Sequence, residues 1–227
     1  TRYEGHRSWH GFVQQMEREV EAQARPDAKG ALHLKLGIVY EEKFLQKVRA
    51  LQHYQKAFKL NPSSTEALER ARAIYREMGK LEMVSQLLDI EFKGTQESKR
   101  ALRLLIDLAE VLGDRGELER AEATYRRALD ASGGDVAVST ALEDLLINEG
   151  WEERVSLLED GAERVAAKDA RQASKQLLRA ARIARRFGSE AAEGYLKRSI
   201  YHDPTNEAAS VLFDLARAAE DRLGELM

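Results

Sequence analysis

Apolar residues along this chain recur at the three- and four-residue spacing of one helix face, in short stretches separated by breaks. The segment around Gly116 shows the pattern, with one apolar stripe before that glycine and a second after it: Leu105, Leu108, Ala109 and Leu112, then Ala121, Tyr125 and Ala128. No alternating strand pattern is found. The prolines fall only between periodic stretches, where a helix has to end: Pro26, Pro62 and Pro204. The pattern predicts an all-α chain.

The whole pattern returns every 71 residues. One half of the repeat shows this at three positions that lie 71 apart in successive copies: Ala50, Ala121 and Ala192; Tyr54, Tyr125 and Leu196; Ala57, Ala128 and Ser199. The other half keeps the same step: Trp9, Lys80 and Trp151; Val13, Val84 and Val155; Met16, Leu87 and Leu158. A fixed period of this kind indicates stacked repeats that share a continuous core, with an extended surface suited to binding.

Each 71-residue repeat divides into two helical hairpins. We therefore expect a single solenoid over residues 1–227 with about twelve antiparallel helices. The predicted boundaries are an opening half repeat (second helix only) at 1–25, five hairpin repeats at 28–63, 64–94, 97–133, 135–167 and 169–204, and a closing helix at 206–227.

Small and aromatic residues alternate at the predicted helix contacts. The order Leu-Ala-x-x-Leu…Gly…Ala-x-x-x-Tyr-x-x-Ala around Gly116 resembles the tetratricopeptide repeat, and the first 71-residue repeat matches it as well, with Leu36, Gly37 and Tyr40 followed by Ala50, Tyr54 and Ala57. The resemblance covers about residues 25–205. It implies a right-handed α–α superhelix in which the first helix of each hairpin lines a concave groove that binds a peptide or a partner protein.

Composition narrows the function classes. The 227 residues carry a net charge of −3 and contain no cysteine, so disulfides and thiolate chemistry are excluded. The charge gives no general attraction to nucleic acid or membrane, and no apolar run is long enough to span a bilayer. We expect a cytoplasmic protein that is not an enzyme and needs no cofactor. The chain begins at Thr1, inside the repeat pattern, so we expect it to be part of a longer protein.

The strongest functional signal is a row of cations on the first helix of the fifth hairpin. Their spacing of 4, 4, 3 and 4 residues aligns them on one face, the basic stripe: Arg171, Lys175, Arg179, Arg182 and Arg186. The resemblance places this face in the groove, where family members use cations to hold acidic or C-terminal carboxylates. It puts Ile106, Glu110 and Ala141 where the family's carboxylate clamp needs Lys, Asn and Asn, so a complete clamp is not expected.

A plainer interpretation stays open for the basic stripe. Its cations could pair with carboxylates of the neighbouring helices on an ordinary solvated surface. The candidate carboxylates are Glu153, Asp160, Glu163, Asp214 and Asp221.

Further up the inferred groove the charge changes sign. Asp107, Glu110 and Asp114 on the third hairpin and Asp144 on the fourth form an acidic stretch. A groove with one basic and one acidic end would fix the direction of a bound peptide. We also expect Leu34 and Ile38, near the other end of the groove, to anchor apolar side chains.

Two smaller features bear on partners. The opening helix lacks the helix before it, so Trp9, Val13 and Met16 are expected to be exposed and to support self-association through that end. His6 and His10 are four residues apart, but no third ligand is evident and we expect no metal site.

The leading hypothesis is therefore a non-catalytic scaffold that binds a protein or peptide, with an acidic sequence as the favoured partner. An RNA-binding helical-repeat module is an alternative, which the acids in the groove disfavour. A purely structural spacer array is another.

Overall fold

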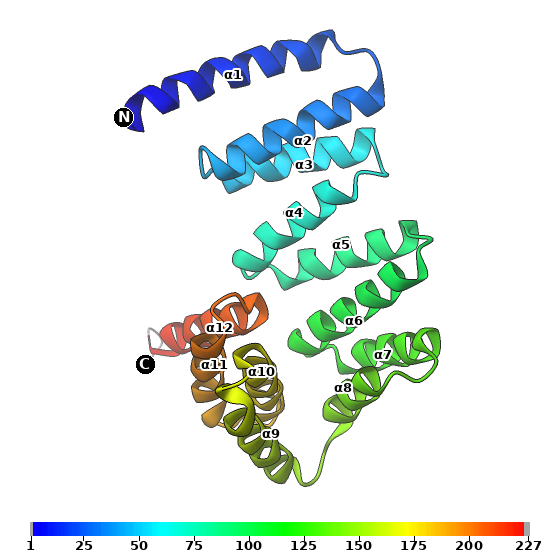
Figure 1. Ribbon diagram of the computed structural model, residues 1–227, viewed down its shortest axis with the longest axis vertical. Helices are drawn as coiled ribbons and strands as arrows, with labels where there is room; N and C mark the ends of the chain where they lie inside the picture. The colour runs from blue at the N-terminus through cyan, green and yellow to red at the C-terminus, as the bar shows by residue number, and fades with distance from the viewer. Residues whose placement is uncertain (1, 225–227) are drawn as a thin grey trace. The chain divides into compact units, whose positions relative to one another are not determined.

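In the computed structural model, the described backbone covers residues 2–224 and the described side chains are those of residues 9–219 and 221. Over this part the chain is entirely helical apart from its connections, without a strand. The helices are α1 (Arg2–Ala22), α2 (Pro26–Glu42), α3 (Lys47–Leu60), α4 (Thr65–Glu77), α5 (Leu81–Gly94), α6 (Ser98–Asp114), α7 (Leu118–Ser132), α8 (Val136–Leu146), α9 (Trp151–Ala166), α10 (Ala170–Arg186), α11 (Ala191–His202) and α12 (Glu207–Gly224) (Figure 1). The predicted all-α architecture of about twelve helices is confirmed, whereas the predicted repeat boundaries stay a prediction.

The chain forms two compact units, Thr1–Tyr75 and Arg76–Met227. The first contains α1, α2, α3 and most of α4, and the second contains α5 to α12. Each unit has its own buried apolar residues. The candidate site described below lies wholly within the second unit.

The residues that recur every 71 positions are the ones that pack the helix pairs α2/α3, α6/α7 and α10/α11. The small residues at these positions are buried. Exposure is 8% for Ala192 and 0% for the other five: Ala50, Ala57, Ala121, Ala128 and Ser199. The larger residues at the intervening position are Tyr54, Tyr125 and Leu196, and all three are buried too. The small residues let the helices approach and the large ones fill the space beside them.

Contact between α2 and α3 in the first unit is very close at Gly37. A β-carbon there would lie 2.6 Å from Cδ1 of Tyr54, and the ring fills the space that a side chain would need. Tyr54 is 1% exposed and its hydroxyl donates a hydrogen bond to Glu41. The glycine is thus required by packing, although the helix itself would favour alanine.

The expectation that the opening helix exposes its apolar face is wrong. Val13 and Met16 are 6% and 4% exposed, and Trp9 is half-buried. The reason is that α1 folds back onto α2, the helix that follows it, so its apolar face does not depend on a preceding helix. His10 packs edge-on against Phe44, with the ring centroids 4.8 Å apart, and the side chain of His6 lies outside the described residues.

In the second unit the chain changes course between α8 and α9. Helix α8 packs on α7, while α9 packs on α10, and the connection between them begins with Ile147 in an extended conformation, at a ψ of 131°, and ends with Gly150 in the left-handed one (Figure 1). Beyond α11, the last helix, α12, reaches the start of the unit. Arg76 pairs with Glu207 at 3.9 Å, and a β-carbon at Gly79 would lie 3.3 Å from Leu215. This curling back encloses the groove described next.

Candidate functional site

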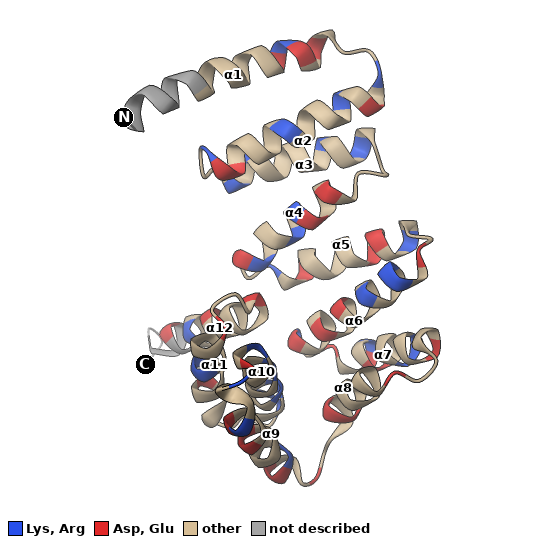
Figure 2. Ribbon diagram, viewed as in Figure 1, with Lys and Arg blue, Asp and Glu red and all other residues tan. Residues whose placement is uncertain are grey.

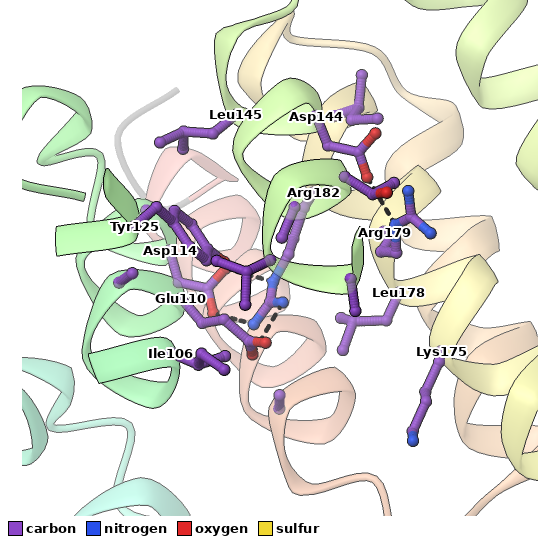
Figure 3. Close-up of a pocket in the computed structure, with 18 of the residues that line it drawn as sticks. Ile106, Glu110, Asp114, Tyr125, Asp144, Leu145, Lys175, Leu178, Arg179 and Arg182 are labelled. Atoms are coloured by element: carbon purple, nitrogen blue, oxygen red, sulfur yellow. Dashed lines mark hydrogen bonds and ion pairs between the residues drawn. The ribbon is translucent and has the colours of Figure 1, made fainter. Parts of the chain in front are cut away.

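A groove with a volume of about 1030 Å³ runs along the inner side of the second unit. Its walls come mainly from α6, α8 and α10, the first helices of the last three predicted hairpins, and the start of α12 closes one side. Helix α10 therefore lies across the groove from α6, although the two are far apart in the sequence (Figure 3). A ligand in the groove would contact several repeats at once.

The floor of the groove is apolar. Ile106 and Leu145 are half-buried and pack on the core cluster that contains Leu105 and Tyr125, and Leu178 is buried at 7% exposure on the α10 side. The close-up shows these apolar side chains among the charged residues Glu110, Asp114 and Arg182 (Figure 3). The floor therefore offers a ligand a partly open apolar surface, which suits the side chains of a peptide.

Arg182 spans the groove from α10 to α6. Its Nε and Nη2 atoms donate hydrogen bonds to the two carboxylate oxygens of Asp114, each at 2.8 Å, and its Nη1 donates to Glu110 at 3.1 Å (Figure 3). The Asp114 side chain is only 7% exposed and that of Arg182 is 22% exposed. A bidentate pair of this kind fixes both side chains and joins residues 68 positions apart.

The surroundings raise the pKa values of Arg182 and Tyr125. Burial alone would lower the pKa of Arg182, but the charges of Asp114 and Glu110 outweigh it and raise the pKa overall. Burial first, and then the negative charge of Glu110, raises the pKa of Tyr125. Both groups therefore keep their protonated form, and the arginine stays a cation.

A cluster of arginines surrounds Asp144 of α8. Its carboxylate accepts hydrogen bonds from Arg179 at 2.6 Å and from Arg154 at 2.8 Å, and the side chain is 10% exposed. Arg186 donates to the backbone carbonyls of Asp144 and Leu145 at the end of α8. Burial lowers the pKa of Arg186, opposed by the charge of Asp144. Three guanidinium groups thus gather around one carboxylate.

Three buried polar atoms on the lining have no hydrogen-bond partner among the described residues: Nη2 of Arg179, Nη2 of Arg186 and Oε1 of Gln176. The two guanidinium nitrogens are donors that belong to the arginine cluster around Asp144. Such groups are uncommon in folded proteins because a buried donor without an acceptor is destabilising.

Lys175 marks the open end of the groove. It is exposed, lines the groove and forms no ion pair with the described residues. Asp203 lies nearby, and hydrogen bonds from the hydroxyl and the backbone amide of Thr205 lower its pKa against the opposing effect of burial, with smaller contributions from the charges of Arg171 and Lys175. This end of the groove therefore keeps cationic side chains in contact with solvent.

The structure brings most of the predicted site residues together. Lys175, Arg179, Arg182 and Arg186 line the groove, as do Glu110 and Asp144. Arg171 is exposed beside it rather than in its lining, and Asp107 lines a small adjoining cavity between α6 and α12. Leu34 and Ile38 are half-buried on α2 in the first unit.

The expected separation into a basic end and an acidic end is wrong. Along α6, cations occupy the first half and acids the second half, and the acidic half faces the basic face of α10 (Figure 2). Arg182 pairs with Glu110 and Asp114, and Arg179 pairs with Asp144. Opposite charges meet across the groove because the second unit curls back on itself.

One of the carboxylates proposed as local partners of the basic stripe, Glu163, pairs with a different helix. Glu163 of α9 pairs with Arg198 of α11 at 3.1 Å, and Glu159 on the same helix pairs with Arg198 as well. These two carboxylates of α9 are therefore bound to α11. Arg154 of α9 lies outside the groove lining but pairs with the groove residue Asp144 at 2.8 Å, and the sequence pattern did not indicate this pair because it depends on the course of the chain between α8 and α9.

A metal site and a membrane-spanning helix each place requirements on the described residues. No group of three or more potential metal ligands occurs within the part of the chain whose side chains are described. Of the helices as far as they are described, none combines the length and the apolar character needed to cross a membrane.

The fold defines the class of protein: a helical-repeat protein of the solenoid type. No protein-family model and no curated protein sequence matches the chain. Among solved structures it is similar to YrrB, a TPR protein with an unusual peptide-binding site, with a TM-score of 0.45 and 18% identity over 87% of this chain and 96% of that one. It is also similar to the TPR2AB domain of yeast Sti1 in complex with pHSP90, with a TM-score of 0.39 and 17% identity over 87% of this chain and 86% of that one. Both are tetratricopeptide repeat proteins, the family that the sequence pattern resembles.

Proposed function

We propose that the protein is a cytoplasmic, non-catalytic scaffold that binds a peptide or a peptide-like segment of a partner protein in the groove of the second unit. The observation that carries the proposal is the groove itself, with its apolar floor at Ile106, Leu145 and Leu178 and hydrogen-bonding groups along its walls. An extended peptide presents side chains and backbone carbonyls at once, and this lining suits both.

The unpaired donors favour a ligand rich in acceptors. Arg179 and Arg186 each keep one guanidinium nitrogen without an acceptor, and a peptide supplies carbonyl or carboxylate oxygens. Lys175 adds an exposed cation at the open end. We therefore propose that the bound segment places a carboxylate near Lys175 and backbone carbonyls near the arginine cluster around Asp144.

RNA is the less favoured ligand for this groove. Glu110, Asp114 and Asp144 stand on its walls, and their charges would repel phosphate groups. A purely structural spacer would require neither the open apolar floor nor the unpaired donors.

The test uses peptides selected from a displayed random library against the whole chain, with affinities measured by titration calorimetry. Lys175→Glu should weaken binding by about tenfold, because it reverses an exposed groove charge that takes part in no ion pair with the described residues. Lys168→Glu, an equally exposed change just before α10 and outside the groove lining, is the matched control and should have no effect. Arg179 and Arg182 are unsuitable for this test because their reversal would break internal ion pairs.

Equal affinities for Lys175→Glu and Lys168→Glu would move the site out of the groove. Selective binding of single-stranded RNA in place of peptides would support the nucleic-acid alternative. The absence of any selectable ligand would support the spacer alternative.

A further inference from the structure

Leu45, in the turn between α2 and α3, has the left-handed backbone conformation, with a φ of 56°, and it is the one non-glycine residue with positive φ among those described. The corresponding turns of the other four predicted hairpins have glycine at this conformation: Gly79, Gly116, Gly150 and Gly188, with φ between 64° and 80°. A β-carbon makes this conformation unfavourable for leucine, whereas glycine adopts it freely. The turn therefore contains a leucine where the fold prefers glycine.

Nothing within the described part of the fold compensates for this strain. The Leu45 side chain is 80% exposed, so it contributes almost no burial. The turn is closed by backbone hydrogen bonds that any residue could make, with the amide of Gln46 donating to the carbonyl of Tyr40 at 2.8 Å. Backbone strain of this kind is found most often at functional positions, so Leu45 is a candidate for contact with another molecule.

Leu45 belongs to a larger apolar surface of the first unit. Val48 at the start of α3 is 63% exposed and Phe12 of α1 is 42% exposed. Helix α1 reaches this turn, because His10 packs on Phe44 and Trp9 lies under the ammonium group of Lys43 at 5.6 Å. We name Phe44, Leu45 and Val48, which follow one another in the turn and at the start of α3, the turn patch. Exposed apolar side chains gathered at one place are typical of an interaction surface.

The charges around the turn patch indicate what covers it. Residues 43–49 contain three cations and no acid: Lys43, Lys47 and Arg49. The nearest carboxylates in the sequence, Glu41 and Glu42, are both engaged by Arg70 of α4, at 3.2 Å and 3.3 Å, and Glu42 also lies 3.8 Å from Lys43. Residues 41–49 together carry three cations and two acids, and Arg70 adds a fourth cation beside those acids, so the charge around the turn patch is positive and its complement is an acidic surface.

We propose that the turn patch is a second binding site, separate from the groove, for a protein segment that presents an apolar side chain flanked by Asp or Glu. Leu45 is the central contact, and the basic rim selects the acidic flanks. The site lies in the first unit, so it does not depend on the groove of the second unit and extends the proposed scaffold function to a second partner or a second segment of the same one.

The decisive variant is Leu45→Gly, which removes the side chain and restores the residue that the other turns use. Because the strain disappears, the melting temperature should be kept or raised, while binding is lost. Opposite effects on stability and binding separate a contact residue from a structural one, since loss of a structural residue lowers both. Val48→Ala, within the turn patch, should weaken binding, and Val136→Ala, a comparably exposed valine of α8 at 78% exposure, is the matched control.

The experiment selects random linear peptides on the whole chain and removes those that also bind Leu45→Gly. The expected result is enrichment of aromatic or aliphatic residues flanked by Asp and Glu, with affinity reduced about tenfold or more by Leu45→Gly and unaffected by Val136→Ala and by Lys175→Glu. The proposal is overturned if every selected peptide binds Leu45→Gly as well as the native chain. It is also overturned if the patch instead mediates binding to phosphatidylserine vesicles, or if Leu45→Gly converts a dimer into a monomer in light scattering. Lys175→Glu tests the groove of the second unit, so its effect on groove binding decides nothing about the turn patch.

Discussion

The close contact between Gly37 and Tyr54 makes a sharp test of how the first unit packs. In Gly37→Ala the new β-carbon would lie 2.6 Å from Cδ1 of Tyr54 and closer still to Cε1, well inside the normal contact distance. The ring has little freedom to withdraw, because it is 1% exposed and its hydroxyl is bonded to Glu41, which also pairs with Arg70. Helix α2 and helix α3 must therefore move apart, or the ring must leave its preferred rotamer.

Two opposing effects set the magnitude. Overpacking of a well-filled core costs about 1–3 kcal/mol, while alanine in place of glycine within a helix gains up to about 1 kcal/mol. We expect Gly37→Ala to lower the free energy of unfolding by roughly 1–2 kcal/mol. Chemical denaturation followed by far-UV circular dichroism measures this change.

Gly11→Ala is the matched control. Gly11 also lies within a helix of the first unit, but a β-carbon added to it would meet no described atom within 4 Å. This variant should raise the free energy of unfolding by about 0.4–1 kcal/mol. If Gly37→Ala stabilised the chain as much as Gly11→Ala does, the close contact with Tyr54 would be refuted. Adding Tyr54→Leu, which copies Leu196 at the equivalent position of the third 71-residue repeat, should restore most of the loss.

Two further predictions concern buried polar pairs. The Nδ1 atoms of His33 and His53 lie 3.1 Å apart, and burial, followed by the charge of His33, lowers the pKa of His53 to about 4. Between pH ~6.5, the ordinary pKa of histidine, and the lowered pKa of His53 of about 4, the unfolded chain binds more protons than the folded one. The free energy of unfolding should therefore be highest above pH ~6.5 and fall as the pH drops through this range. His53→Gln should make the free energy of unfolding less dependent on pH in denaturation curves, and an unchanged pH dependence would contradict the assignment. Ser174 and Ser199 are fully buried and their hydroxyls are 2.9 Å apart. Ser199→Ala should cost about 1 kcal/mol. The double change with Ser174→Ala should cost less than the sum of the two single changes, because the hydroxyls bond each other as well as the Asn206 amide, and additive losses in denaturation curves would show that they do not act as a pair.

The sequence by itself determined the helices and the way adjacent helices pack. The 71-residue period identified Ala50, Ala121, Tyr54 and Tyr125 as packing residues, and all four are buried. This succeeds because the contact between two neighbouring helices depends on side chains three or four residues apart, which the sequence displays directly. The same helical spacing predicts that Lys175 and Arg179 share one face of α10, and both line the groove.

The partners of these groove residues were decided by the tertiary structure alone. Arg182 meets Asp114 across 68 residues, and Arg154 joins Arg179 on Asp144. The turn patch likewise depends on α1 folding back toward Phe44. Such contacts result from the angles between successive helices, and a small change at each one accumulates along a stack. No short stretch of sequence encodes that accumulated curvature, so residues on one face can be predicted while the residues that they meet across the groove cannot.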